Sequence, residues 1–240
     1  MGAVPEAAGT LASMPSPLEP TVGWGVLHLF CRVGPLADGE SVTAAVKAAE
    51  ADDVQVVPAA MLGHKADVAV MALGSDLWRL RRLQTELASA GLDVVDSYVS
   101  LTELSEYSQG VPDEMKEARL HPRLPPEGKA AFCFYPMSKR RGDVSNWFTL
   151  PYDDRKELMY AHGASGRKFA GRVLQVITGS TGVDDFEWGV TLFAVHPDDL
   201  KEVVYTMRFD EASALYAEFG PFYTGVVAPV EEVLRLVGVQ

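Results

Sequence analysis

A tyrosine and three cations stand close together in the stretch FCFYPMSKRRGDVSNWF, residues 132–148. Tyr135 lies in an aromatic run that is typical of a buried strand, and Lys139, Arg140 and Arg141 follow it. Because lysine and arginine pair with carboxylates at short range, this grouping predicts a pocket for a ligand that carries several carboxylates. The alternative is a core tyrosine followed by a solvated turn.

Alternation along this strand decides which side chains accompany the phenol. Period two places Cys133, Tyr135 and Met137 on one face and the phenylalanines on the other. Lys139 joins the tyrosine's face if the alternation continues. Pro136 donates no ladder hydrogen bond, so it predicts an edge strand or a bulge.

His162 is the histidine whose surroundings could do chemistry. It lies in a predicted helix over residues 151–171, on the face that also carries Met159 and Gly166. The run Gly163–Gly166 is unfavourable for a helix, so something must gain from these small residues. One interpretation is a large flat ligand against the helix, with His162 as the ligand of a haem iron. The other is a tight contact between helix and sheet, with His162 as a core histidine.

The composition indicates an ordinary globular chain with an acidic surface. A net charge of −12 over 240 residues argues against nucleic acid or an anionic membrane as a partner. No apolar run is long enough for a membrane helix. Cys31 and Cys133 lie in apolar runs, so we expect two buried free thiols and a reducing, cytoplasmic location.

The order of predicted elements is β-α-β-β-α-β, and it occurs twice. This order is ferredoxin-like and predicts an α+β fold with tandem ferredoxin-like halves, of the dimeric α/β-barrel type, in one subunit. In the second half we expect one long helix over residues 197–220. The expected divisions are a flexible tail (1–23), an N-terminal half (24–108), a linker (109–129) and a C-terminal half that binds the ligand (130–240).

Five segments together resemble a known family. They read FYPMSKRR, NWFTLP, LMYAHGASGRKFAG, QVITGSTGVDDFEWGVTLFA and MRFDEASALYAEFGPFYTG. In these segments the chain resembles the coproheme decarboxylases, the haem-synthesis branch of the chlorite dismutase superfamily. The match is dense from residue 130 to 225, and looser before residue 108.

The resemblance implies a reaction and a set of site residues. Iron coproporphyrin III (coproheme) would be both substrate and redox cofactor, hydrogen peroxide the oxidant and haem b the product. His162 would bind the iron, Tyr135 would become the radical that attacks two propionates, and Lys139 would hold the reactive propionate. Further contacts with the macrocycle or its propionates would come from Met137, Gln175, Arg208 and Ser213.

Two points separate this function from its alternatives. Relatives that convert chlorite to chloride and oxygen carry a distal arginine where this chain has Gln175, which weakens the chlorite dismutase and haem peroxidase interpretations. A non-catalytic haem carrier would need His162 but neither Tyr135 nor Lys139. A neutral histidine can take a proton from peroxide near pH 7, and His121 in the linker is the predicted distal base.

Family resemblance also implies partners. It implies a homopentamer, and it allows a transient contact with the coproporphyrin ferrochelatase. Trp147 and Trp188 are aromatic neighbours for which packing is the expected role.

Overall fold

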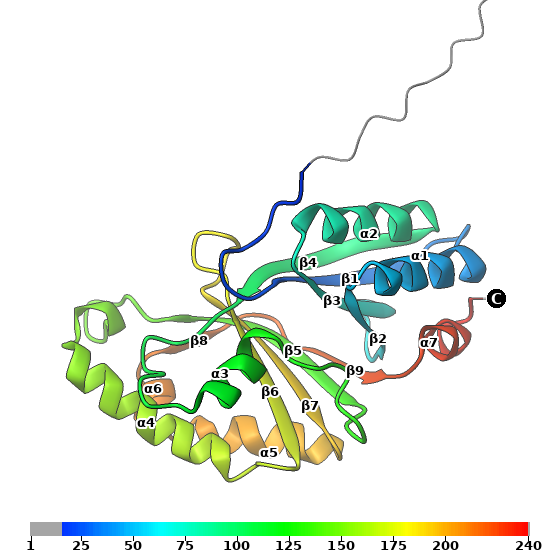
Figure 1. Ribbon diagram of the computed structural model, residues 1–240. Coiled ribbons are helices and arrows are strands. Elements are labelled where there is room, and N and C mark those ends of the chain that lie inside the picture. The colour runs from blue at the N-terminus through cyan, green and yellow to red at the C-terminus, as the bar shows by residue number, and fades with distance from the viewer. Residues whose placement is uncertain (1–15, 240) are drawn as a thin grey trace, which may run out of the picture.

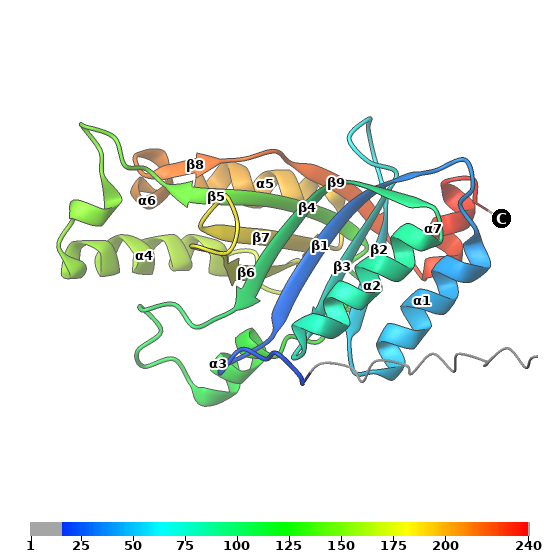
Figure 2. The same cartoon turned by 90° about the horizontal axis from the view of Figure 1, so that it is seen from above.

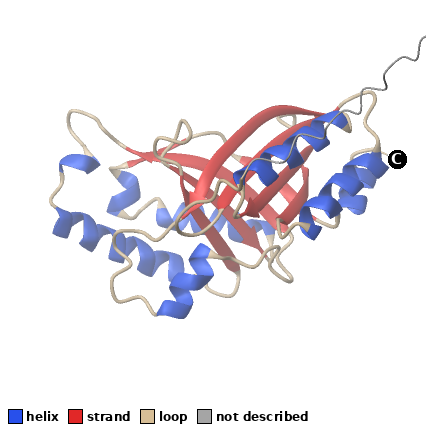
Figure 3. Cartoon of the chain, turned by 45° about the horizontal axis from the view of Figure 1, so that its top comes forward, coloured by secondary structure: helices blue, strands red, loops and turns tan. Residues whose placement is uncertain are grey.

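The computed structural model describes residues 16–239, in which helices surround a central set of strands (Figure 3). The predicted tail therefore lies in part, at residues 1–15, outside the described residues. The first half contains β1 (Gly25–Val33), α1 (Gly39–Ala51), β2 (Gln55–Met61), β3 (Val68–Gly74), α2 (Leu77–Ser89) and β4 (Leu92–Thr102). Helix α3 (Asp113–Leu120) lies within the predicted linker.

The second half begins with β5 (Ala131–Lys139), a 3-10 turn (Trp147–Thr149) and α4 (Tyr152–Arg167). It continues with β6 (Val173–Gly179), β7 (Trp188–Ala194), α5 (Pro197–Met207), α6 (Glu211–Ala214), β8 (Ala217–Phe219), β9 (Tyr223–Val227) and α7 (Val230–Leu236). The α+β class and the ferredoxin-like halves are confirmed. The long helix expected over residues 197–220 is wrong, because the chain breaks after Met207 and forms α6 and β8 instead.

The strands close into a ring. Their order is β7-β6-β4-β1-β3-β2-β9-β5, β5 pairs back with β7, and β8 continues beside the end of β5. Strand β5 therefore has partners on both sides, and the edge predicted from Pro136 is wrong. Pro136 is tolerated because it sits where the partner changes, between the pairing of residues 131–134 with β9 and that of residues 137–139 with β8.

Side-chain alternation divides the core into an inner and two outer layers. Phe132 and Phe134 point into the ring, where they pack with Phe30 and Phe193. Cys133 and Tyr135 point outward, as the sequence predicts, and both cysteines are free and buried. The ring interior is filled with side chains, so a large ligand must bind outside it.

Helices cover the outer faces unequally. Helices α1 and α2 cover the outer face of the first half, with α1 capped by Asp38 and α2 by Asp76. Helix α7 joins them, although it comes last in the chain. Helices α4 and α5 lie on the opposite side (Figure 1), and α4 and α7 stand at opposite ends of the molecule (Figure 2). No helix in the described residues is both long and apolar enough to span a membrane.

Candidate functional site between α4 and the outer sheet face

The outer face of β5, β7 and β6 forms one wall of the candidate site. Strand pairing aligns Tyr135 with Val190 and Val190 with Ile177, in one row across the three strands. Two residues before Tyr135 on β5, the neighbouring row contains Cys133 and Gln175. Two residues after Tyr135, the next row contains Met137, Trp188 and Gly179. Tyr135, Met137 and Gln175 therefore share a face. Ile177, on β6 at the end of the row that begins with Tyr135, keeps 52% of its surface exposed, so the wall is apolar but incompletely covered.

Helix α5 packs on part of this face, with Leu200 and Val203 in one cluster with Tyr135. Helix α4 lies beside α5, approaches β6 where Gly166 meets Gln175, and is packed loosely. Only Ser165 is buried among its 16 residues. His162 Nδ1 lies 3.2 Å from Asp210 Oδ2, and Ser165 Oγ donates to Asp210 Oδ1 at 2.7 Å. The aspartate thus assigns Nδ1 as the donor, and His162 Nε2 takes part in no hydrogen bond within residues 16–239.

The charge state of His162 suits a ligand for iron. Burial lowers the pKa of His162, the positive charge of Lys139 lowers it further, and Asp210 opposes both. His162 is 22% exposed and Asp210 16% exposed, so water screens this pair only partly. The imidazole is therefore neutral near pH 7, with the Nε2 lone pair free.

The small residues of α4 serve two purposes. A Cβ on Gly166 would lie 3.2 Å from Gln175 Nε2 and 3.5 Å from Met207 Cε, so the helix packs tightly at this residue. A Cβ on Gly163 would approach only the end of the Arg167 side chain, at 3.4 Å. The contact between helix and sheet is therefore tight at Gly166, as one of the two interpretations predicts. At Gly163, by contrast, there is room beside His162.

Tyr135 is enclosed by aromatic rings. Its ring stacks on Phe222 with centroids 4.5 Å apart and meets Phe219 edge-on at 5.7 Å. Burial raises the pKa of Tyr135, and the nearby charge of Arg208 opposes that rise. The Arg208 guanidinium lies 5.1 Å from the Phe219 ring, so a cation stands close to the aromatic rings around the phenol. The phenol is therefore neutral, buried and near one positive charge.

The three cationic side chains at and after the end of β5 have different partners. Arg140 pairs with Glu218 at 3.4 Å, and Arg141 pairs with the buried carboxylate of Glu187. The Lys139 side chain is buried against α6 and the 3-10 turn. Its Nζ donates to Ala212 O at 2.7 Å and lies 4.2 Å from the Trp147 ring centroid. The two arginines are thus occupied by carboxylates of the chain itself.

Lys139 remains as a buried cation. Burial lowers the pKa of Lys139 to about 8, against the opposing effect of Glu187. A carbonyl and an indole face do not neutralise its charge, and no ion pair among the described residues includes its Nζ. Lys139 can therefore still attract an anion.

The other predicted residues divide between this site and the rest of the fold. Ser213 lies on α6, next to the Ala212 carbonyl that Lys139 contacts. His121 ends α3, where its Nδ1 lies 2.6 Å from Glu117 Oε1 and its ring packs against Trp24 at 4.8 Å. These contacts hold His121 near the start of β1, and its role as distal base stays a prediction.

Asp210 is the site residue that the sequence did not indicate. An aspartate just before a short helix is expected to cap that helix, and nothing local links Asp210 to a histidine 48 positions earlier. Only the packing of α6 against α4 brings the two together.

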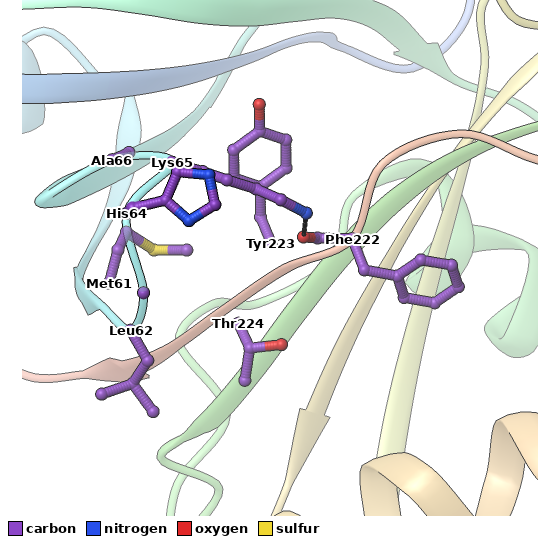
Figure 4. A pocket seen from close by; sticks show the side chains of 9 residues that line it. Met61, Leu62, His64, Lys65, Ala66, Phe222, Tyr223 and Thr224 are labelled. Atoms are coloured by element: carbon purple, nitrogen blue, oxygen red, sulfur yellow. Dashed lines mark hydrogen bonds between the residues drawn. The ribbon is translucent and has the colours of Figure 1, made fainter.

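A small pocket lies behind Phe222, at the turn between β2 and β3 (Figure 4). Lys65 Nζ crosses it to donate to Phe222 O at 2.6 Å, while the Phe222 ring points away from His64 and Lys65. The lining residues in the described chain are Met61–Ala66 and Phe222–Thr224, which include none of the predicted site residues. This pocket supports the position of Phe222 and is separate from the candidate site.

The residues between α4 and the sheet fit an iron porphyrin. The fit rests on the neutral His162 with its free nitrogen, the exposed Ile177 and the loosely covered α4. Lys139 and Arg208 supply positive charge for propionates. Gln175 reaches Gly166, so its side chain must turn aside to admit a macrocycle.

Comparisons with known proteins agree with this geometry. The chlorite dismutase family model matches residues 37–228. A haem-binding protein from Thermus thermophilus is 38% identical, with a TM-score of 0.80 over 93% of this chain and 99% of that one. Chlorite dismutase from Candidatus Nitrospira defluvii in complex with imidazole is 17% identical, with a TM-score of 0.72 over 91% and 96%. A mutant of the same enzyme gives 17% identity and a TM-score of 0.71 over 91% and 97%.

Proposed function

This chain belongs to the chlorite dismutase family, and we propose that it converts iron coproporphyrin III to haem b with hydrogen peroxide. The binding of a haem-type ligand is supported by the 38% identical haem-binding relative and by the neutral His162. The observation that carries the decarboxylase function is a buried phenol, Tyr135, on the outer face of β5 and close to the positive charge of Arg208. A haem carrier has no need of that phenol.

Each residue has a definite part in the proposed reaction. His162 Nε2 binds the iron of the substrate, and Asp210 holds the ring in the required tautomer. The iron and peroxide together supply the oxidising equivalents. Tyr135 gives up its phenolic hydrogen atom and then takes one from the β-carbon of a propionate. Lys139 and Arg208 pair with propionates and so hold that carbon at the phenol.

The stoichiometry of the reaction follows from its balance. One propionic acid side chain and one hydrogen peroxide give one vinyl group, one carbon dioxide and two waters. Two rounds therefore consume two peroxides and release two carbon dioxides. Because Tyr135 is restored in each round, it acts as a relay rather than as a reagent.

Chlorite dismutation has less support in this chain. By resemblance, chlorite-converting relatives place an arginine where Gln175 lies here, and the Gln175 amide carries no charge to hold an oxyanion. A cytoplasmic homopentamer and a transient contact with the coproporphyrin ferrochelatase are proposed from resemblance alone. Native mass spectrometry tests the first of these: five-subunit particles are expected, and a monomer would contradict the assembly.

The deciding experiment titrates the coproheme-loaded protein with hydrogen peroxide and follows the porphyrin mass. Two successive losses of a propionate carboxyl, ending at haem b, are expected. Tyr135→Phe should bind coproheme but give no vinyl product, while the matched control Tyr205→Phe, on the exposed side of α5, should react as the original chain does. Bleaching without loss of carboxyl groups would reject the proposed function.

A further inference from the structure

A carboxylate that the sequence did not single out lies at the edge of the candidate site. Glu103 directly follows β4, and the pairing of Leu101 with Gly179 and of Thr102 with Thr178 puts Glu103 beside Ile177. Its side chain leans over Gly179, where an added Cβ would lie 2.3 Å from Glu103 Cδ and Oε2. The missing side chain at Gly179 is what makes room for this carboxylate.

Trp188 fixes the orientation of the carboxylate. Trp188 pairs with Gly179 on the neighbouring strand, and its Nε1 donates to Glu103 Oε1 at 3.3 Å. Burial raises the pKa of Glu103, against the opposing effect of this hydrogen bond. Glu103 is exposed as a residue, and its raised pKa makes it a better proton acceptor than a carboxylate with the ordinary pKa.

Glu103 also lines a pocket large enough for small molecules. The lining residues in the described chain are Pro20–Val22, Leu101–Leu104, Gly179, Thr181 and Val183. Among these residues Glu103 alone is ionisable, and the rest are apolar or carry hydroxyl groups. A small neutral molecule with O–H groups, rather than a large anion, suits such a lining.

The pocket adjoins the wall that carries Tyr135. Continued by one residue beyond its last pair, the register of β4 with β6 lines Glu103 up with Ile177, which shares a row with Val190 and Tyr135. Three strand spacings of about 4.8 Å each put the two ends of the row roughly 14 Å apart. A molecule bound at Glu103 thus lies at the far end of a row on the outer sheet face that begins with Tyr135.

We infer that this pocket admits hydrogen peroxide and that Glu103 accepts its proton. The inference rests on the proposed function. The carboxylate takes a proton from one peroxide oxygen, leaving a hydroperoxide anion. It returns that proton to the other oxygen as the O–O bond breaks, so that one water leaves and the carboxylate is regenerated. The two oxidising equivalents of the remaining oxygen would pass through the iron of coproheme and Tyr135 to the propionate, whose oxidation supplies the two hydrogens with which that oxygen leaves as the second water. Glu103 thereby takes the part that the sequence assigned to His121, whose contacts lie with Glu117 and Trp24.

Two of the carboxylates near Glu103 have partners of their own. Asp184, on the loop after β6, accepts from Val99 N at 2.7 Å, and Glu187 is paired with Arg141. Glu106 lies 3.5 Å from Arg155. Asp185 follows Asp184 on that loop, and Glu19 precedes the pocket residue Pro20. His121 follows Leu120, whose carbonyl accepts from Thr102 Oγ1 at 2.8 Å. The Glu103→Gln variant therefore has to separate the titration of Glu103 from that of these groups.

The first test measures the rate of peroxide consumption by the coproheme-loaded protein as a function of pH. Glu103→Gln keeps an oxygen for Trp188 Nε1 but cannot accept the proton, so we expect a loss of roughly 100-fold and a flattened acid limb. Glu103→Asp should restore part of the rate. The matched control Glu106→Gln should change the rate less than about twofold. A Glu103→Gln variant that reacts at the original rate would overturn the inference.

The second test uses the chain without coproheme and so does not depend on the proposed function. Trp188 fluorescence, taken as the difference from Trp188→Phe, should titrate with a pKa above the usual carboxylate range. The titration should vanish in Glu103→Gln and persist in Glu106→Gln. Persistence in Glu103→Gln would overturn the assignment of the proton to Glu103. Absence of decarboxylation in the unsubstituted chain, by contrast, would reject the proposed function alone.

Discussion

Replacing Asp210 with asparagine tests how His162 is held. The Asp210 carboxylate accepts hydrogen bonds from His162 Nδ1 at 3.2 Å and from Ser165 Oγ at 2.7 Å. Asparagine keeps the shape and one acceptor oxygen but removes the negative charge. The substitution thus isolates the contribution of that charge to iron binding.

The expected magnitude comes from the loss of this partner. Removing the group that accepts a hydrogen bond from the other ring nitrogen of a metal-bound histidine typically lowers the affinity for the metal roughly 10–100-fold, about 1.4–2.7 kcal/mol. Protonation of His162 cannot account for that loss. Asp210 raises the pKa of His162, so removing its charge lowers the pKa further and keeps the ring neutral at pH 7. The weaker binding must then come from a less basic Nε2.

The assay is a spectroscopic titration of the unloaded chain with coproheme, combined with the iron–histidine stretching frequency of the reduced complex. Asp210→Asn should raise the Kd by the stated factor and lower the frequency. Ser165→Ala leaves the carboxylate in place, so it should change both quantities less. If Asp210→Asn has the original Kd and frequency, the aspartate does not tune the histidine and the argument fails.

Two further substitutions test the walls of the site. Lys139 has a pKa of about 8 in the folded chain against an ordinary 10.5, so the unfolded chain binds more protons between these values. The free energy of unfolding should therefore rise from pH 8 to 10.5, and urea denaturation of Lys139→Met should lack this rise; an identical pH dependence would contradict the burial of a charged lysine. Gly179→Ala places a Cβ 2.3 Å from the Glu103 carboxyl group and should displace it, so peroxide consumption should slow as in Glu103→Gln. An unchanged rate and unchanged Trp188 fluorescence would show that the carboxylate does not need this space.

Local patterns in the sequence predicted the faces of strand β5, and the start of helix α2 is equally local. The period of two in β5 separates Phe134 from Tyr135, because successive side chains of any strand point to opposite faces. Asp76 caps α2 through its own side chain, which accepts from Trp78 N at 3.0 Å. Both features depend on a few neighbouring residues, so they can be predicted without the rest of the fold.

Features that depend on distant parts of the chain could not be predicted. Pro136 indicates an edge in isolation, yet β8 and β9 arrive from far along the chain and divide the partner side of β5 between them. The break after Met207 is equally non-local. A helix continued through residues 208–214 would compete with the hydrogen bonds that Asp210 makes to His162 and Ser165 on α4.

The unequal covering of two similar halves explains where the site lies. In the first half α1 buries five of its 13 residues, and α7 adds a third helix to the same face, so the outer sheet surface is closed. In the second half α5 packs on β5, β6 and β7 with Leu200 and Val203 buried, whereas α4 buries only Ser165 of its 16 residues. The ring interior is filled by aromatic and aliphatic side chains and offers no alternative. The loosely packed α4, with the half-exposed Ile177 on the sheet nearby, is therefore the part of this half that can most easily admit the proposed haem-type ligand beside His162.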